Sequence, residues 1–132
     1  MEMWKGAVFE LHAVVSGTPQ LHFKAWKEVF DQLLNEVNEG VTSRGFDYEN
    51  DYLPFVHGRP RYVGVRALLE SRDIQLPYGH PSDPVDRRTV CGIANRKNEL
   101  FRSYLSEKGI RPDEAAVKLI DELRASGIRT GI

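Results

Sequence analysis

The sequence predicts an α/β fold that is mostly helical, with several helices inserted between two strands of one crossover unit. Three observations support this fold class. A short apolar run rich in Val and Phe lies near the N-terminus, four later segments show helical periodicity, and a second short apolar run follows them. A single crossover unit of this kind contributes two parallel strands and does not complete a sheet.

The first strand is expected within residues 4–15, WKGAVFELHAVV. Its length and its β-branched and aromatic residues favour a buried strand over a helix. Ser16 to Pro19 breaks the run, and Thr18 is a candidate N-cap for the next element. A helix is expected from Gln20 to Val37, because apolar residues recur there at spacings of three and four. These residues are Leu21, Phe23, Val29, Phe30, Leu33, Leu34 and Val37.

The middle of the chain alternates between loops and helices. The expected elements are a loop over 38–53, a short helix over 52–56, a turn over 57–60, a helix over 61–71, a loop over 73–86 and a helix over 89–108. The loop assignment over 73–86 depends on three prolines and a glycine, and the last helix is expected to end at Gly109.

A last helix is expected to begin at Pro112, because proline suits the first helical turn and two acidic residues follow it. Its inner face is expected to consist of Ala116, Leu119, Ile120 and Leu123. Gly127 suits the position just past its end. A second strand is expected over 128–132.

Composition excludes several classes of protein. The chain has 132 residues, 41% of them hydrophobic and 28% charged, which is typical of a folded domain. A formal net charge of -1 does not favour nucleic acid as a partner. The single cysteine, Cys91, rules out an internal disulfide framework, and no apolar run is long enough to cross a bilayer. We therefore expect a cytoplasmic protein with neither a membrane nor a nucleic-acid partner.

Several segments together resemble the haloacid dehalogenase (HAD) superfamily, and most closely its β-phosphoglucomutase-like branch. They are AVFELHAVVSGT, LHFKAWKEVF, GRPRYVGVRALLESR, ANRKNELF and LIDELRASGIRTGI. The resemblance implies three parts: a first core strand and motif loop over 1–18, a helical cap over 19–108, and a core helix with the start of a second core strand over 109–132. It implies a Rossmann-like core, incomplete here, that carries the cap after its first strand.

The resemblance also implies a phosphosugar phosphatase or phosphoglucomutase that uses Mg²⁺-assisted phosphoryl transfer. Glu10 stands where the family has its nucleophilic aspartate, and His12 stands at its acid/base position. The side chain of Glu10 and the backbone carbonyl of His12 would be metal ligands in an incomplete site. Both side chains lie on one side of a strand, since they are two residues apart. Thr18 matches the family, whereas Ala13 and Gly17 do not.

Two features lead us to expect little or no autonomous activity. A glutamate at position 10 moves the attacking oxygen by roughly 1 Å, and such a displacement can cost ~100-fold in rate. The family's later residues, which hold the phosphoryl group, offset its charge and complete the metal site, normally follow the second strand. The sequence is therefore expected to be a truncated chain with an altered first motif.

The cap positions match the family better. Arg61 matches the arginine that reaches a substrate phosphate, and Lys97 and Asn98 belong to the cap's Arg-Lys-Asn triplet. His22 and Trp26 match residues near the hinge and sugar pocket. These five residues and Thr18 are the candidate substrate-binding set.

Several alternatives remain open. Glu10 and His12 could be a polar strand end that holds no metal, and Arg59, Arg66 and Arg96 could be a solvated basic face. The chain could be a non-catalytic remnant that binds a sugar phosphate. It could also bind a protein partner, either a second copy or a complementing chain, through an open sheet edge. A truncated product without a biochemical role is a third possibility. Cys91 is expected to be a small buried residue.

Overall fold

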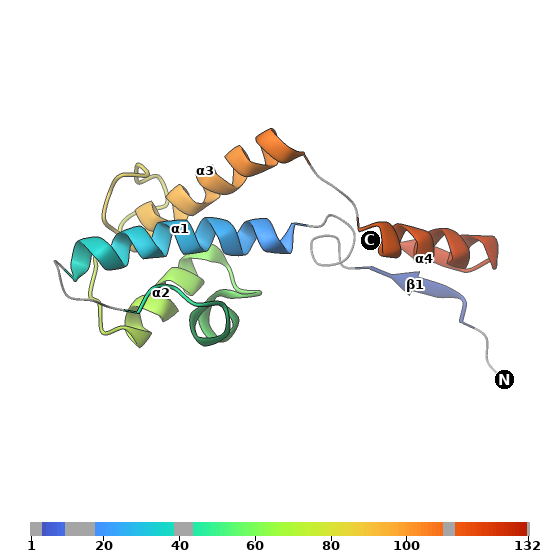
Figure 1. Cartoon of the computed structure of the whole chain (residues 1–132), viewed down its shortest axis with the longest axis horizontal. Helices are drawn as coiled ribbons and strands as arrows, with labels where there is room; N and C mark the ends of the chain where they lie inside the picture. The colour runs from blue at the N-terminus through green and yellow to red at the C-terminus, as the bar shows by residue number, and fades with distance from the viewer. Residues whose placement is uncertain (1–3, 10–17, 39–43, 110–112, 132) are drawn as a thin grey trace. The chain divides into compact units, whose positions relative to one another are not determined.

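The computed structural model describes residues 4–9, 18–38, 44–109 and 113–131. Their elements occur in the order β1 (Gly6–Val8), α1 (Pro19–Val37), the π-helix η2 (Tyr48–Val56), α2 (Arg61–Ser71), α3 (Val90–Lys108), α4 (Glu114–Ala125) and β2 (Arg129–Gly131). The described residues are mostly helical (Figure 1). They include two short parallel strands. This result confirms the fold class predicted from the sequence.

The chain divides into two compact units. The strand unit consists of residues 1–20 and 107–132, and the helical unit consists of residues 21–106. In the strand unit, β1 and β2 pair in parallel, with Gly6 opposite Arg129 and Val8 opposite Gly131. Helix α4 precedes β2, and its end is tied to that strand because Arg124 Nε donates to Thr130 Oγ1 at 2.9 Å.

Three predictions for the strand unit need correction. Among the described residues of 4–15, only Gly6–Val8 forms a strand. The last helix begins at Glu114, because the Asp113 carboxylate accepts from the N–H groups of Ala115 and Ala116 and is therefore the N-cap. Leu119 is not an inner residue, since it is 46% exposed. Residues 10–15 and Pro112 lie outside the described residues.

In the helical unit, α1 and α3 run antiparallel to each other (Figure 1). Contacts at both ends fix this direction. Arg88 pairs with Glu36 at 2.9 Å near the end of α1, and Lys97 contacts His22 at 2.8 Å near its start. Thr89 was expected to be the first helical residue of α3 but is its cap, because its Oγ1 accepts from the N–H of Gly92.

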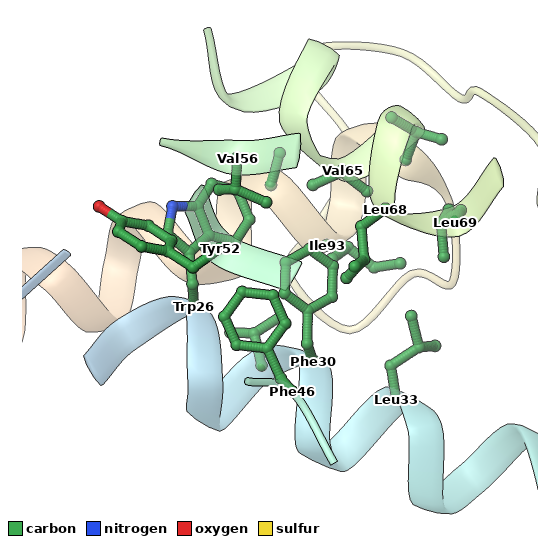
Figure 2. Close-up of a cluster of buried hydrophobic side chains, with 13 residues drawn as sticks. Trp26, Phe30, Leu33, Phe46, Tyr52, Val56, Val65, Leu68, Leu69 and Ile93 are labelled. Atoms are coloured by element: carbon green, nitrogen blue, oxygen red, sulfur yellow. The ribbon is translucent and has the colours of Figure 1, made fainter. Parts of the chain in front are cut away.

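The hydrophobic core of the helical unit lies between α1, η2, α2 and α3. Figure 2 shows Trp26, Phe30 and Leu33 pointing from α1 toward side chains of the other elements. The core cluster consists of Trp26, Val29, Phe30, Leu33, Phe46, Tyr52, Val56, Val65, Leu68, Leu69, Val90, Ile93 and Ala94. The three- and four-residue spacing of its α1 members is the spacing on which the helix prediction depended.

The π-helix η2 requires a further correction, because most of its length was expected to be loop. It begins at Tyr48, four residues before the expected short helix, with Asp47 as its N-cap. Wide turns define it, such as the bond from the N–H of His57 to the carbonyl of Tyr52 at 2.8 Å. A π-helix does not follow the 3.6-residue period, so the apolar pattern could not reveal it.

Candidate functional site

The candidate site forms where the first half of α1 faces the middle of α3. Lys97 and Phe101 lie four residues apart on α3, and His22 and Trp26 lie four residues apart on α1. Residues at this spacing share one face of a helix. The Lys97 ammonium lies 5.1 Å from the centre of the Trp26 ring and 4.9 Å from that of Phe101. The rings of Trp26 on α1 and Phe101 on α3 therefore both lie near the Lys97 ammonium.

His22 contacts the same ammonium. Its Nδ1 lies 2.8 Å from Lys97 Nζ, and its ring stacks on Phe101 with 4.0 Å between centroids and 12° between planes. A charged ammonium has no lone pair, so Nδ1 must be the acceptor while Lys97 is protonated. The imidazole is then neutral and carries its proton on Nε2. His22 thus orients the Lys97 ammonium.

Lys97 is a buried cation, with only 6% of its surface exposed. Among the residues that the structure describes, no carboxylate lies within ion-pairing distance of it. Burial, and to a smaller extent the positive charge of Arg61, together lower the pKa of Lys97 to about 8. Lys97 is therefore mostly charged at pH 7, at a cost to the folded state.

Arg61 begins α2, immediately after the turn that ends at Pro60. Its side chain is exposed, and its guanidinium lies 4.8 Å from the centre of the Tyr62 ring. Because its charge lowers the pKa of Lys97, the two cations repel each other. An anion bound near both would remove this repulsion, which gives the site a preference for negatively charged ligands.

A stability measurement can test the cost of the buried charge. We expect Lys97→Met to raise the free energy of unfolding at pH 7 by about 2 kcal/mol, since it keeps the apolar stem and removes the charge. The unfolded chain binds the Lys97 proton up to pH ~10.4, whereas the folded chain loses it near pH 8. As the pH rises from about 8 to ~10.4, the free energy of unfolding of wild type therefore increases relative to that of the variant.

Urea unfolding of both proteins at pH 7 and at pH 9.5 would measure this difference. Lys108→Met is the matched control, because Lys108 is an exposed lysine on the same helix. A Lys97→Met variant that is less stable than wild type at pH 7 would contradict the expectation.

Comparisons with known proteins identify the family. No protein-family model matches the chain. Two proteins named β-phosphoglucomutase, from Mycobacterium bovis and Mycobacterium tuberculosis, are each 35% identical to it over 133 residues. These alignments cover 99% of this chain and 51% of each relative, so the chain spans about half the length of the curated relatives it matches.

The crystal structure of CbbY from Rhodobacter sphaeroides in complex with phosphate has a similar fold. Its TM-score is 0.56 at 20% sequence identity, over 97% of this chain and 49% of that chain. Together these similarities support a β-phosphoglucomutase-like chain of the HAD superfamily. The resemblance recognised in the sequence is thereby confirmed.

The structure brings together part of the HAD candidate set. His22, Trp26 and Lys97 are in direct contact, and Arg61 is near enough to affect the charge of Lys97. Asn98 is half-buried next to Lys97 in α3. Thr18 is buried and belongs to the strand unit.

Glu10 and His12, the expected catalytic residues and metal ligands, lie outside the described residues. Within the part of the chain that the structure describes, no group of three or more His, Cys, Asp or Glu side chains could hold a metal ion. No helix among them is long and apolar enough to span a bilayer.

Two residues of the site were not predicted from the sequence. Phe101 lies on the helix expected over 89–108 and contacts both His22 and Lys97. Asn95 belongs to the quoted ANRKN segment, two residues before Lys97, and that position was the available signal. Cys91 is buried as expected, and burial raises the pKa of its thiol.

Proposed function

We propose that the helical unit binds the phosphoryl group of a phosphorylated sugar with Arg61 and Lys97, as part of a HAD phosphosugar phosphatase or phosphoglucomutase. One observation carries this proposal: Lys97 is buried, has no carboxylate partner among the described residues, and is repelled by Arg61. A fold accepts such a cost where function needs it. The names of the mycobacterial relatives support a phosphosugar as the ligand.

Arg61 and Lys97 would bind the phosphoryl group in different ways. The Arg61 guanidinium is planar and can donate two parallel hydrogen bonds to phosphate oxygens from the exposed side. The Lys97 ammonium is a point charge in surroundings from which most water is excluded, so its attraction to an anion is stronger than at the surface. Trp26 is buried and packs in the core, which keeps the Lys97 stem in place.

Catalysis by this chain is proposed to be absent or very slow. In the family-derived scheme the Glu10 carboxylate attacks phosphorus and His12 exchanges the proton with the leaving group. Both residue types depart from the family pattern, and phosphoryl transfer depends almost entirely on positioning and on electrostatic stabilisation. Mg²⁺ would neutralise phosphate charge in that scheme. The alternative function is binding of a sugar phosphate without turnover.

Ligand titration tests the proposed site. The chain has two tryptophans, Trp4 and Trp26, so a Trp4→Phe background leaves Trp26 as the only indole reporter. We expect glucose 1-phosphate or glucose 6-phosphate to change its fluorescence, because Lys97 lies against the Trp26 ring. Glucose without a phosphate should give no change. An Arg61→Ala/Lys97→Met variant should lose at least about 100-fold in affinity, since each charged hydrogen bond contributes about 1.5 to 3 kcal/mol.

Arg66→Ala is the matched control for loss of one positive charge from α2. Arg66 is exposed and pairs with Glu70 at 3.3 Å. Its variant should bind within twofold of wild type, where twofold is about 0.4 kcal/mol. Equal binding by wild type and the double variant would rule out this site. Turnover of the sugar phosphate that is abolished by Glu10→Gln would instead contradict the expected inactivity.

We further propose that the strand unit associates with a second copy of the chain. Within the described residues, β1 and β2 pair only with each other, and a two-stranded sheet is marginal alone. Val8 is 85% exposed and Trp4 is 79% exposed beside this sheet. An apolar side chain next to an unpaired strand edge favours pairing with another chain.

Light scattering over a concentration series measures this association. We expect the mass to rise toward that of a dimer with concentration, and a Val8→Lys variant to remain monomeric because a charge on the edge strand opposes pairing. Val117→Lys, on the exposed surface of α4, is the control. A wild-type monomer at every concentration would contradict the proposal, and so would a dimer that Val8→Lys leaves unchanged.

A further inference from the structure

We propose that Tyr62 is a positioning residue that fixes the Arg61 guanidinium for its phosphate ligand and ties it to the loop before α3 through Asn95. This inference rests on the proposed function, since it assumes that Arg61 binds the phosphoryl group. Tyr62 directly follows Arg61 in the first turn of α2. The contacts of Tyr62 show what the tyrosine does in that place.

The Tyr62 hydroxyl joins two neighbours. It accepts a hydrogen bond from Arg61 Nη2 at 3.1 Å and donates one to Asn95 Oδ1 at 3.2 Å. The Tyr62 ring also lies under the Arg61 guanidinium, 4.8 Å from its central carbon. One side chain therefore holds Arg61 both by a hydrogen bond and by a cation–π contact. An acidic side chain in this position would neutralise Arg61, whereas Tyr62 leaves its charge available to a ligand.

Asn95 connects this pair to the loop before α3. Its Nδ2 donates to the carbonyl of Pro81 at 2.9 Å and to the carbonyl of Asp83 at 3.1 Å. Both amide hydrogens and the amide oxygen of Asn95 are thus used, and this arrangement determines which way its Oδ1 points. The hydrogen-bonded series from the loop through Asn95 and Tyr62 ends at Arg61.

The loop itself is well fixed. The Asp83 carboxylate accepts from the hydroxyl of Thr89 at 2.7 Å and from the N–H of His80 at 3.1 Å. Gly79 has a φ of +77° and lies so close to the Asp83 carboxylate that an added Cβ would approach it to 2.2 Å. Tyr62 is therefore anchored to a rigid support, as a positioning residue requires.

This network lowers the cost of binding. An exposed arginine loses much of its rotamer freedom when it binds an anion in one geometry. Arg61 has already lost part of that freedom in the unliganded protein, because Tyr62 holds it. Removing only the Tyr62 hydroxyl should therefore weaken phosphate binding while leaving the charge of the site unchanged.

The test compares Tyr62→Phe with wild type in two backgrounds. Glucose 1-phosphate and inorganic phosphate are the probes, and calorimetry measures their affinity. We expect Tyr62→Phe to weaken binding by about three- to tenfold, the value of one hydrogen bond. In an Arg61→Ala background the same change should alter affinity by less than about twofold, since the hydroxyl acts through Arg61. Tyr48→Phe, which removes an exposed hydroxyl on η2, should have no effect in either background.

A second measurement needs no ligand. NMR of the Arg61 guanidinium, assigned by its absence in Arg61→Lys, reports how fast the group rotates. Rotation should be severalfold faster in Tyr62→Phe than in wild type. Equal weakening of binding by Tyr62→Phe in both backgrounds would overturn the inference, as would unchanged rotation. If wild type binds neither probe, the proposed function fails, and the NMR result alone decides whether Tyr62 positions Arg61.

Discussion

Replacing Asp51 with asparagine is expected to lower the free energy of unfolding by about 3 kcal/mol, because it breaks a buried cluster of charges. Asp51 is 1% exposed. Arg44 donates to both of its oxygens, at 2.7 and 3.0 Å, and Arg72 and the N–H of Asp47 donate to Oδ2 at 3.0 and 2.8 Å. An amide at this position would leave Arg72, which is largely buried, without its carboxylate.

The cluster stabilises the fold by joining segments that are far apart in the sequence. Arg72, just past the end of α2, also donates to the backbone carbonyls of Arg44 and Gly45. These contacts place the start of η2 against α2. Urea unfolding monitored by circular dichroism would measure the loss. Glu70→Gln is the control, since the Arg66–Glu70 pair is exposed and its loss should cost less than about 0.5 kcal/mol.

The effect of Asp51 should also depend on pH. Burial raises the pKa of Asp51, but hydrogen bonds from Arg44, Asp47 and Arg72 lower it more, so the pKa lies below its usual value. A depressed carboxyl pKa contributes stability above the unfolded value of about 3.9, and this contribution is lost as the pH falls through the folded value. The difference between wild type and Asp51→Asn should therefore shrink below pH ~4. A difference that grows on acidification would contradict the assignment.

Replacing Phe30 with alanine is expected to cost about 4 kcal/mol, because the ring fills the centre of the core (Figure 2). Phe30 is 0% exposed. Its ring centroid lies 5.2 Å from that of Trp26 and 4.9 Å from that of Phe46. Alanine would remove these contacts and leave a cavity that packed neighbours fill only in part. A loss below about 1.5 kcal/mol would show that the site collapses freely around alanine.

Two further variants keep this measurement interpretable. Phe30→Leu should give a smaller loss, because leucine fills more of the cavity, and it provides a value if the alanine variant does not fold. Leu53→Ala is the matched surface control on η2, where the side chain is 44% exposed. It should change the free energy of unfolding by no more than about 0.5 kcal/mol. Equal losses for Phe30→Ala and Leu53→Ala would contradict the core assignment.

Local pattern was enough to predict α1, α2 and α3 almost to the residue. Each carries apolar side chains at helical spacing and ends in a clear break, as at Pro60 before α2 and Gly109 after α3. The same reasoning failed for η2. Its position depends on the ion pairs of Asp51 with Arg44 and Arg72, which are seven and 21 residues away in the sequence. The spacing of apolar residues does not indicate such pairs.

For the candidate site too, the sequence indicated which residues belong to it but not how they contact one another. The motif resemblance identified Arg61, Lys97, His22 and Trp26 by position alone, before any contact among them was known. It did not reveal that Lys97 is buried, that His22 orients it or that Tyr62 contacts Asn95. These properties come from side chains of different helices that meet only in the folded chain.

The sequence by itself determined the fold class, the family and the type of residue at each candidate position, because periodicity, chain breaks and motifs are local. Only the tertiary structure decided the chemical state of those residues. Burial and neighbouring charge set the pKa of Lys97 at about 8, and both depend on how α1, α2 and α3 pack. Desolvation and Coulomb interactions act through space, so a charge that looks ordinary in the sequence becomes costly, and therefore informative, in the fold.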